Sequence, residues 1–287
     1  MSAMFCYQCQ EAAKNEGCTV RGVCGKTPEV AHLQDLLLWL VKGISFWGVR
    51  ARKNLNIVDP ATDLFVAEAL FATITNANFD PDRFVAWIKE AVERRDSLRQ
   101  RAQARCGELH GSDACDSNLP DYLTWTPKSY DTAILDMKGQ LVGILSDPDL
   151  PAGTPADIRS LRELLVYGLK GLAAYTDHAY VLEHTNDDLP AFIQEALDAT
   201  MNDSLGADDL VGLVLKAGEM GVEAMRLLDE ANTSTYGAPE PTQVSLGVRP
   251  GPGILVSGHD LLDLAELLEQ AEGKGVNIYT HGEMLPA

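Results

Sequence analysis

The sequence predicts a mainly α-helical N-terminal domain, which is followed by the first β-α-β unit of a Rossmann-like α/β domain. Three observations predict this order. Residues 1–27 are polar and rich in Cys and Gly without any period, residues 28 to about 232 carry apolar side chains at helical spacing, and residues 241–287 hold two apolar runs around an amphipathic stretch. We therefore expect a loop over 1–27, a helical domain over 28–240, and the start of a truncated α/β domain over 241–287.

The first three helices are predicted from start signals and apolar spacing. Thr27-Pro28-Glu29 combines a capping hydroxyl, a proline at the first helical position and an acid in the first turn. A second helix is expected over about 61–75. A third helix is expected to begin at Asp80-Pro81 and to end near Cys106-Gly107.

Residues 107–154 predict a long irregular connection, because they hold four prolines and no clear period, with room for a short strand near Gln140 to Leu145. Helices are expected again over about 156–183, 189–200 and 207–231. Two groups of three helices on either side of this connection suggest two three-helix bundles.

The C-terminal region predicts one β-α-β unit. Ile254 to Ser257 and Val276 to Thr280 are short apolar strands, and Asp260 to Ala271 is an amphipathic helix between them. Such a unit is expected to be right-handed with adjacent parallel strands. Parallel sheets are normally covered on both faces, so a two-stranded sheet is expected to be part of a larger domain.

The composition excludes two classes of partner and leaves others open. The 287 residues carry a net charge of −19, which repels nucleic acid and anionic membrane surfaces. A small neutral or cationic substrate and a basic electron-transfer partner remain compatible with this charge. No run approaches the roughly 18 apolar residues of a membrane span, and polar residues stand where a signal peptide would be apolar. We therefore expect a soluble, cytoplasmic protein.

Four cysteines in the loop 1–27 form the clearest motif. Cys6, Cys9, Cys18 and Cys24 have the spacing C-x2-C-x8-C-x5-C, and polar segments between them allow four thiolates to surround one tetrahedral centre. A zinc ion and an iron–sulfur cluster both accept such ligands. Disulfides are disfavoured in a reducing compartment, and unliganded thiols are disfavoured because the loop has no core of its own.

A second candidate site lies at the ends of the two predicted strands. His259 follows the first strand and Glu283 follows the second, and the carboxyl ends of parallel neighbours meet at one rim, where open α/β sheets bind ligands. An imidazole and a carboxylate there can share an iron centre. The alternative is that both are capping or solvated residues. His281, two residues before Glu283, is expected to lie outside the direct ligands.

These motifs and several others resemble the hybrid cluster protein family, whose members are also called prismane proteins or hydroxylamine reductases. The resemblance covers nearly the whole chain as the N-terminal half of the family's sequence, and it is weakest over 100–155. The segments that carry it are Phe5 to Glu11, Gly17 to Thr19, Gly22 to Lys26, Leu33 to Leu37, Phe71 to Asn78, Ser160 to Leu165, Asp229 to Thr233, Ser257 to Leu261 and Tyr279 to Ala287.

The resemblance implies an oxidoreductase with two clusters. The four N-terminal cysteines would hold a [4Fe-4S] cluster that relays electrons, and His259 and Glu283 would be ligands of a hybrid iron–sulfur–oxygen cluster at which catalysis occurs. Similar proteins reduce hydroxylamine to ammonia, with the reduction of nitric oxide to nitrous oxide as the competing assignment. The implied partners are a small nitrogenous substrate and a redox donor protein.

The chain departs from the family in its cysteines. The hybrid cluster of the family needs several cysteines and a further glutamate, whereas only Cys106 and Cys115 remain here, in the predicted connection. We therefore expect either a fragment of a longer enzyme or a second chain that supplies the other ligands. The alternatives are a standalone [4Fe-4S] electron-transfer module, an inactive N-terminal fragment without the catalytic cluster, and a structural zinc module on a helical bundle.

Overall fold

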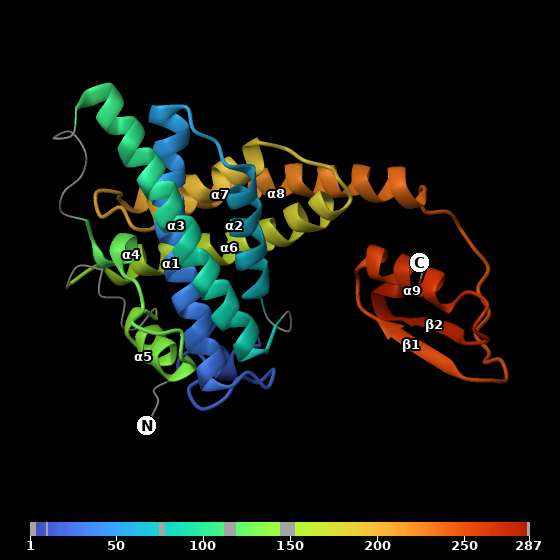
Figure 1. Cartoon of the computed structure of the whole chain (residues 1–287). Coiled ribbons are helices and arrows are strands. Elements are labelled where there is room, and N and C mark those ends of the chain that lie inside the picture. The colour runs from blue at the N-terminus through green and yellow to red at the C-terminus, as the bar shows by residue number, and fades with distance from the viewer. Residues whose placement is uncertain (1–3, 10, 75–77, 112–118, 144–152, 286–287) are drawn as a thin grey trace. The chain divides into compact units, whose positions relative to one another are not determined.

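A computed structural model describes residues 4–9, 11–74, 78–111, 119–143 and 153–285 (Figure 1). The chain divides into two compact units. Unit 1 comprises Met1–Asp177 and Asn186–Ala224, and unit 2 comprises His178–Thr185 and Met225–Ala287. Helices dominate unit 1, and unit 2 contains the strands, so the predicted combination of a mainly α region and a β-α-β unit is confirmed.

Helix α1 (Pro28–Leu55) is the core of unit 1. Its predicted N-cap is confirmed, because the Thr27 hydroxyl accepts a hydrogen bond from the Val30 amide at 3.3 Å. Apolar residues are buried around most of its circumference, from Val30 to Leu55, as expected for a helix that neighbours cover on several sides. The helix ends at Asn56, whose left-handed backbone (φ 55°) stops further helical hydrogen bonding.

Helices α2 (Pro60–Ala72) and α3 (Pro81–His110) pack on α1, and α3 runs beside it (Figure 1). Both begin with an aspartate cap before a proline, in which Asp59 accepts from the Thr62 amide and Asp80 from the Asp82 amide. Helix α3 extends three residues past the predicted stop at Gly107, because a glycine within a helix weakens it without ending it.

Helix α7 (Asp188–Ala199) belongs to the same core as α1 and α2, and this differs from the predicted separation into two bundles. A close approach at Gly48 explains the packing. A Cβ atom at Gly48 would lie 1.7 Å from the Gln194 Oε1 atom, so only a glycine admits the buried Gln194 side chain. Gln194 in turn donates a 2.5 Å hydrogen bond to the buried Asp63 on α2.

The region 107–154 is not the irregular connection that its prolines predict. It contains a short helix, α4 (Asp121–Thr124), and an eleven-residue helix, α5 (Thr132–Val142), which Asp131 caps at the Ala133 amide. Because α5 runs to Val142, the strand suggested near Gln140 to Leu145 is wrong for its described part. Residues 144–152 lie outside the described residues, as do 112–118 with Cys115.

The remaining helices of the chain match their predicted ranges within a few residues. Helix α6 spans Ala156–Val181, and α8 spans Ala207–Tyr236, five residues beyond the predicted end. The two units divide within these helices, at Asp177 and Ala224, while the predicted boundary at residue 240 lies just past the end of α8. None of the described helices is long and apolar enough to span a membrane.

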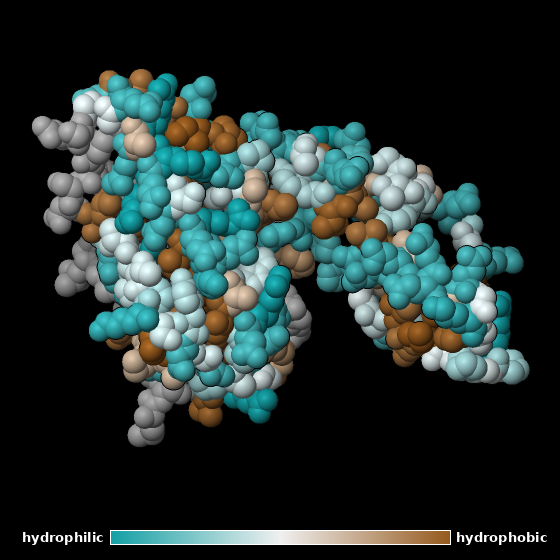
Figure 2. Space-filling model, in the orientation of Figure 1, coloured by the Kyte–Doolittle hydropathy of each residue, from teal (hydrophilic) through white to brown (hydrophobic). Residues whose placement is uncertain are grey.

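Unit 2 contains the predicted β-α-β unit. Strands β1 (Gly253–Ser257) and β2 (Asn277–His281) pair in parallel, with Gly253 opposite Asn277 and Ser257 opposite His281. Helix α9 (Leu261–Ala271) connects them, and a short 3-10 helix, η3 (Gly282–Met284), follows β2. Leu255 is 69% exposed. Figure 2 shows apolar side chains gathered on the surface of this unit. Exposed apolar area on a parallel sheet is the usual mark of a face that another element covers.

Candidate functional site

The cysteine loop, residues 4–27, is held together by backbone pairing between two of its cysteines. Cys6 and Cys18 form an antiparallel bridge, with amide-to-carbonyl distances of 3.0 and 2.7 Å. Gly17 lies directly before Cys18 with φ +155°, and a Cβ atom there would lie 2.5 Å from the Phe5 ring. The glycine therefore allows the two cysteine segments to approach each other.

The loop lies on α1 through a small apolar cluster and a buried lysine. Met4, Cys18 and Ala31 are buried together, and Cys6 and Ala13 pack against them. Lys26 is almost fully buried, and its ammonium donates to Gln34 Oε1 at 2.5 Å and lies 3.7 Å from the Cys6 sulfur. The loop is thus fixed to the helical core by contacts with residues of α1, Ala31 and Gln34.

Some groups around the Cys6 and Cys18 sulfur atoms favour the negatively charged thiolate, and burial opposes it at Cys6. The Ala13 amide lies 3.5 Å from the Cys18 sulfur, and N–H groups and ammonium ions beside sulfur stabilise thiolates. Burial nevertheless raises the pKa of the Cys6 thiol, and the nearby Lys26 ammonium works in the opposite direction. A bound cation would remove this conflict, because metal coordination deprotonates a thiol.

The donor set fits an iron–sulfur cluster or a zinc ion. Cys6, Cys9, Cys18 and Cys24 are all free thiols, and none forms a disulfide. The bridge brings Cys6 and Cys18 together, but nowhere in the described residues do three His, Cys, Asp or Glu side chains gather around one point. Such a centre requires four ligands, and a buried ammonium and an amide donor beside sulfur would stabilise the charge of its thiolates. Cys106, on α3, is a half-buried free thiol far along the chain from this loop.

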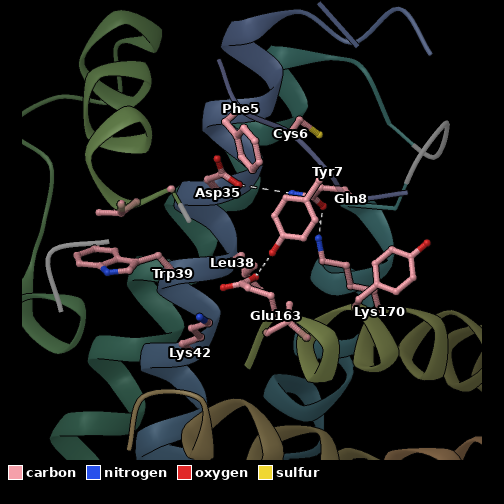
Figure 3. Close-up of a pocket in the computed structure, with 14 residues that line it drawn as sticks. Phe5, Cys6, Tyr7, Gln8, Asp35, Leu38, Trp39, Lys42, Glu163 and Lys170 are labelled. Carbon is pink, nitrogen blue, oxygen red and sulfur yellow. Dashed lines mark hydrogen bonds between the residues drawn. The ribbon is translucent and has the colours of Figure 1, made fainter. Parts of the chain in front are cut away.

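A partly buried polar network beside Cys6 was not predicted from the sequence. The Tyr7 hydroxyl donates to Glu163 on α6 at 2.6 Å, and the Gln8 side chain connects two charges, accepting from Lys170 on α6 and donating to Asp35 on α1 at 3.5 Å (Figure 3). Its members lie up to 162 residues apart, so no local signal reveals it. The network joins the loop to both helices.

The charges of this network are strongly perturbed by burial. Burial raises the pKa of Asp35 to about 7, although Lys170, Lys26 and Lys42 all favour its ionised form. Burial likewise lowers the pKa of Lys170 to about 8. Burial and the Glu163 carboxylate raise the pKa of Tyr7, which therefore remains a hydrogen-bond donor. Strongly shifted ionisable groups that line one cavity are typical of functional sites.

The second candidate site, the rim of unit 2, brings His259 and Glu283 together. The His259 Nδ1 atom lies 3.9 Å from Glu283 Oε2, after β1 and within η3 respectively. Both side chains are exposed, at 61% and 78% of their surface. His281 instead contacts Ser257 across the paired strand ends, with Nδ1 3.3 Å from the hydroxyl. The expected convergence of the two strand ends therefore occurs.

His178 also lies at this rim, and sequence analysis did not single it out. Its ring packs edge-on against His259 with centroids 5.3 Å apart, and its Nδ1 atom lies 3.4 Å from Asp260 Oδ2. Asp260 additionally caps α9 through the Asp263 amide. Burial lowers the pKa of His178. His178, near the end of α6, and His259 are 81 positions apart in the sequence, so no local pattern indicates that they are in contact.

Comparison with protein families gives one match that covers almost the whole chain. Residues 4–287 match the family described as Prismane/CO dehydrogenase family. The matched range includes the cysteine loop, the polar network and the rim.

Curated relatives agree with this match. The chain is 57% identical to a hydroxylamine reductase of Halothermothrix orenii over 285 residues, 55% identical to one of Kosmotoga olearia over 288, and 54% identical to one of Petrotoga mobilis over 284. Each alignment covers 99% of this chain and 50–51% of the relative. The chain thus spans about half the length of the curated relatives it matches.

Proposed function

The chain belongs to the Prismane/CO dehydrogenase family, and from this premise we propose that it acts in an iron–sulfur oxidoreductase of the hybrid cluster type, which reduces hydroxylamine to ammonia. Reduction of nitric oxide to nitrous oxide is the competing reaction. The single observation that carries the proposal is the set of four free thiols beside a buried ammonium in a chain so similar to hydroxylamine reductases.

The cysteine loop is proposed to hold the electron relay, a [4Fe-4S] cluster, through Cys6, Cys9, Cys18 and Cys24. A cluster bound there would supply reversible one-electron transfer. Lys26 would offset the negative charge of the sulfurs, since its ammonium lies 3.7 Å from Cys6. The Tyr7–Glu163 hydrogen bond and the contacts of Gln8 would keep the segment between Cys6 and Cys9 in one conformation.

The rim of unit 2 is proposed to supply part of the catalytic cluster site. His259 and Glu283 offer a nitrogen and an oxygen ligand 3.9 Å apart, and both are accessible. Residues 225–287 contain no cysteine, so this rim by itself provides only part of a hybrid-cluster ligand set. Contact with His178, which in turn contacts Asp260, would hold the His259 ring in orientation.

A redox donor protein and, for the remaining ligands, a segment or chain with further cysteines are the proposed partners. The loop offers an accessible surface for the donor, because Val20 and Val23 are 81% and 64% exposed between Cys18 and Cys24. Exposed apolar side chains beside a redox centre suit a small, transient interface.

A standalone electron-transfer module is the second candidate. It is favoured by the distribution of ligands, because all four clustered cysteines lie in unit 1 and none in unit 2. Such a module would accept and donate electrons without converting hydroxylamine.

The test is to reduce the anaerobically purified chain, add hydroxylamine, and measure ammonia together with reoxidation of the protein. With the segment or chain that supplies the remaining ligands present, ammonia is expected from the unchanged chain and from the control Cys106→Ser, and not from Cys9→Ser. His259→Ala is expected to lose ammonia formation while keeping the electron paramagnetic resonance signal of the loop. A reducible cluster without ammonia formation would contradict the reductase and support the electron-transfer module. Ammonia formation that is unchanged in both Cys9→Ser and His259→Ala would refute the proposed sites.

A further inference from the structure

Lys26 and Gln34 form a buried pair between the cysteine loop and α1. Lys26 is 1% exposed and Gln34 is 0% exposed, and the Lys26 ammonium donates to Gln34 Oε1 at 2.5 Å. The same ammonium lies 3.7 Å from the Cys6 sulfur. Gln34 comes one turn after Ala31, which is buried together with Cys18, so both α1 residues lie on the side of the helix that the loop covers. The pair is therefore part of the contact between the loop and the helix.

The backbone of Lys26 belongs to the turn that carries Cys24. The Gly22 amide donates to the Lys26 carbonyl at 2.9 Å, and the Gly25 amide donates to the Gly22 carbonyl at 2.9 Å. A Cβ atom at Gly22 would lie 3.0 Å from both the Cys24 sulfur and the Lys26 Cβ atom, so this turn is tightly packed. One lysine thus connects both ends of the cysteine motif, because it follows Cys24 by two residues and its ammonium lies beside Cys6.

The Gln34 side chain has a buried hydrogen-bond donor without a partner. An ammonium group can only donate, so the side-chain oxygen of Gln34 faces Lys26, and the side-chain nitrogen, Nε2, is directed elsewhere. No residue that the structure describes accepts a hydrogen bond from this nitrogen. A buried N–H group without an acceptor costs free energy, which an acceptor brought by a ligand would recover. The sulfur atoms of a cluster in the loop that covers this side of α1 would supply such acceptors.

The charge of Lys26 dominates at the Cys6 sulfur. Burial raises the pKa of the Cys6 thiol, and Lys26 opposes this rise more than any other charged group does. Asp35 raises and Lys170 lowers the same pKa to a smaller extent, and the Gln8 side chain links these two residues. Because Asp35 and Lys170 act in opposite directions, Lys26 is the charge that most favours added negative charge at this sulfur.

Positive charge and hydrogen bonds beside sulfur stabilise the reduced form of an iron–sulfur cluster, because that form carries one more negative charge. We propose that Lys26 and Gln34 set the reduction potential of the electron relay, Lys26 through its ammonium and Gln34 as an amide donor that also holds this ammonium beside Cys6. The pair raises the potential at which one electron is accepted from a redox donor protein, and no bond forms or breaks in this chain. The inference rests on the proposed [4Fe-4S] cluster of the loop, and it is independent of the reaction that the relay serves.

The test is a potentiometric titration of the full anaerobically purified chain without hydroxylamine, followed by electron paramagnetic resonance, with iron and sulfide counted in each variant. Lys26→Met is expected to make one-electron reduction less favourable by roughly tenfold or more, and tenfold corresponds to a fall of about 59 mV in the potential. The matched control Lys14→Met removes an exposed lysine of the same loop. Water and salt screen that charge, so a change of less than about twofold is expected.

Gln34→Met carries the test if Lys26→Met fails to bind iron, because it keeps every charge and all four cysteines and removes the amide. Its reduction is expected to become less favourable by roughly threefold, the loss of one hydrogen bond. Equal potentials for Lys26→Met and Lys14→Met, or an unchanged potential in Gln34→Met, would overturn the inference.

The same experiment separates this inference from the proposed function. A bound cluster whose potential is the same in all variants would overturn the role of Lys26 and Gln34 and leave the proposed relay intact. Absence of iron and sulfide from the unchanged chain would refute both.

Discussion

The cysteine loop of unit 1 and the rim of unit 2, the two proposed metal sites, differ in what orders their backbone and in how exposed their candidate ligands are. The loop is short of secondary structure, yet it is anchored by Met4, Cys18 and a lysine that is almost fully buried. The rim consists of regular strand ends, yet its two candidate ligands, His259 and Glu283, are mostly exposed.

The two sites differ in the contacts that fix their backbone. In the loop, long-range contacts such as the Tyr7–Glu163 hydrogen bond fix the irregular backbone, and all four candidate thiols lie in one unit. At the rim, parallel pairing of Ser257 with His281 fixes the backbone, but the side chains beyond it face open surface. The first arrangement is typical of a self-contained centre and the second of a site that further ligands complete.

Among the substitutions considered, Cys9→Ser is expected to have the largest effect, a loss of iron and sulfide from the cysteine loop. Removal of one of four thiolates should abolish the cluster of the loop and destabilise residues 4–27, because metal binding contributes directly to local folding. Iron and acid-labile sulfide per chain are the measurement, with Cys106→Ser as the control that should leave both unchanged. Iron content that stays the same in Cys9→Ser would refute the assignment of the loop.

Gly48→Ala tests the packing of α7 on α1 in the helical core of unit 1. The added methyl group would lie 1.7 Å from Gln194 Oε1 and displace a buried side chain that hydrogen-bonds Asp63, so we expect about 1–3 kcal/mol of lost stability. The measurement is the urea midpoint followed by circular dichroism.

The matched control for that substitution is Gly168→Ala, at an exposed position of α6 where an added Cβ meets nothing within 4 Å. It should gain about 0.5–1 kcal/mol from helix propensity. A Gly48→Ala variant as stable as this control would show that α7 does not pack on α1 as described.

Asp35→Asn tests the polar network beside the cysteine loop through the pH dependence of protein stability. The pKa of Asp35 is raised in the folded protein from 3.8 to about 7, so the folded state holds this proton more tightly than the unfolded state does. Its contribution to stability is full below about pH 4 and is lost as the pH rises through about 7.

The asparagine variant cannot titrate, so its stability should fall less steeply than that of the unchanged chain between pH 5 and pH 7. Melting temperatures at several pH values measure this slope, and Asp82→Asn, at an exposed position on α3, is the control. Parallel slopes for all three proteins would mean that Asp35 titrates in its ordinary range.

Glu283→Ala gives the smallest expected effect, since it should leave the cluster of the loop unchanged. Glu283 is 78% exposed, and its carboxylate lies 3.9 Å from His259 at the rim. Iron, sulfide and the electron paramagnetic resonance signal of the loop should equal those of the unchanged chain. Loss of that signal would mean that Glu283 acts at the cysteine loop and not at the rim.

Local signals in the sequence predict much of this fold. Thr27 and Asp80 cap helices as their side chains and the prolines after them indicate, and the alternation of strand, helix and strand in residues 253–281 follows from apolar runs. Helix α5 was missed because it is short and surrounded by prolines, and the position of α7 was missed because the contact at Gly48 joins helices far apart in the chain.

The candidate sites, too, are predictable from the sequence only in part. The four cysteines, His259 and Glu283 are recognisable from spacing and position, but the residues that support them are not. Lys26, Glu163 and His178 reach their partners only after the chain has folded, across as many as 156 residues. Sequence patterns thus indicate candidate ligands, whereas the charges and contacts around them require the tertiary structure.

The most direct test of the account is to count iron, acid-labile sulfide and zinc per chain in anaerobically purified protein. We expect about four irons and four sulfides, the content of one [4Fe-4S] cluster in the cysteine loop. A distinctly higher iron content would mean that the rim also holds metal. About one zinc per chain without sulfide would contradict the central claim and identify the loop as a structural zinc site.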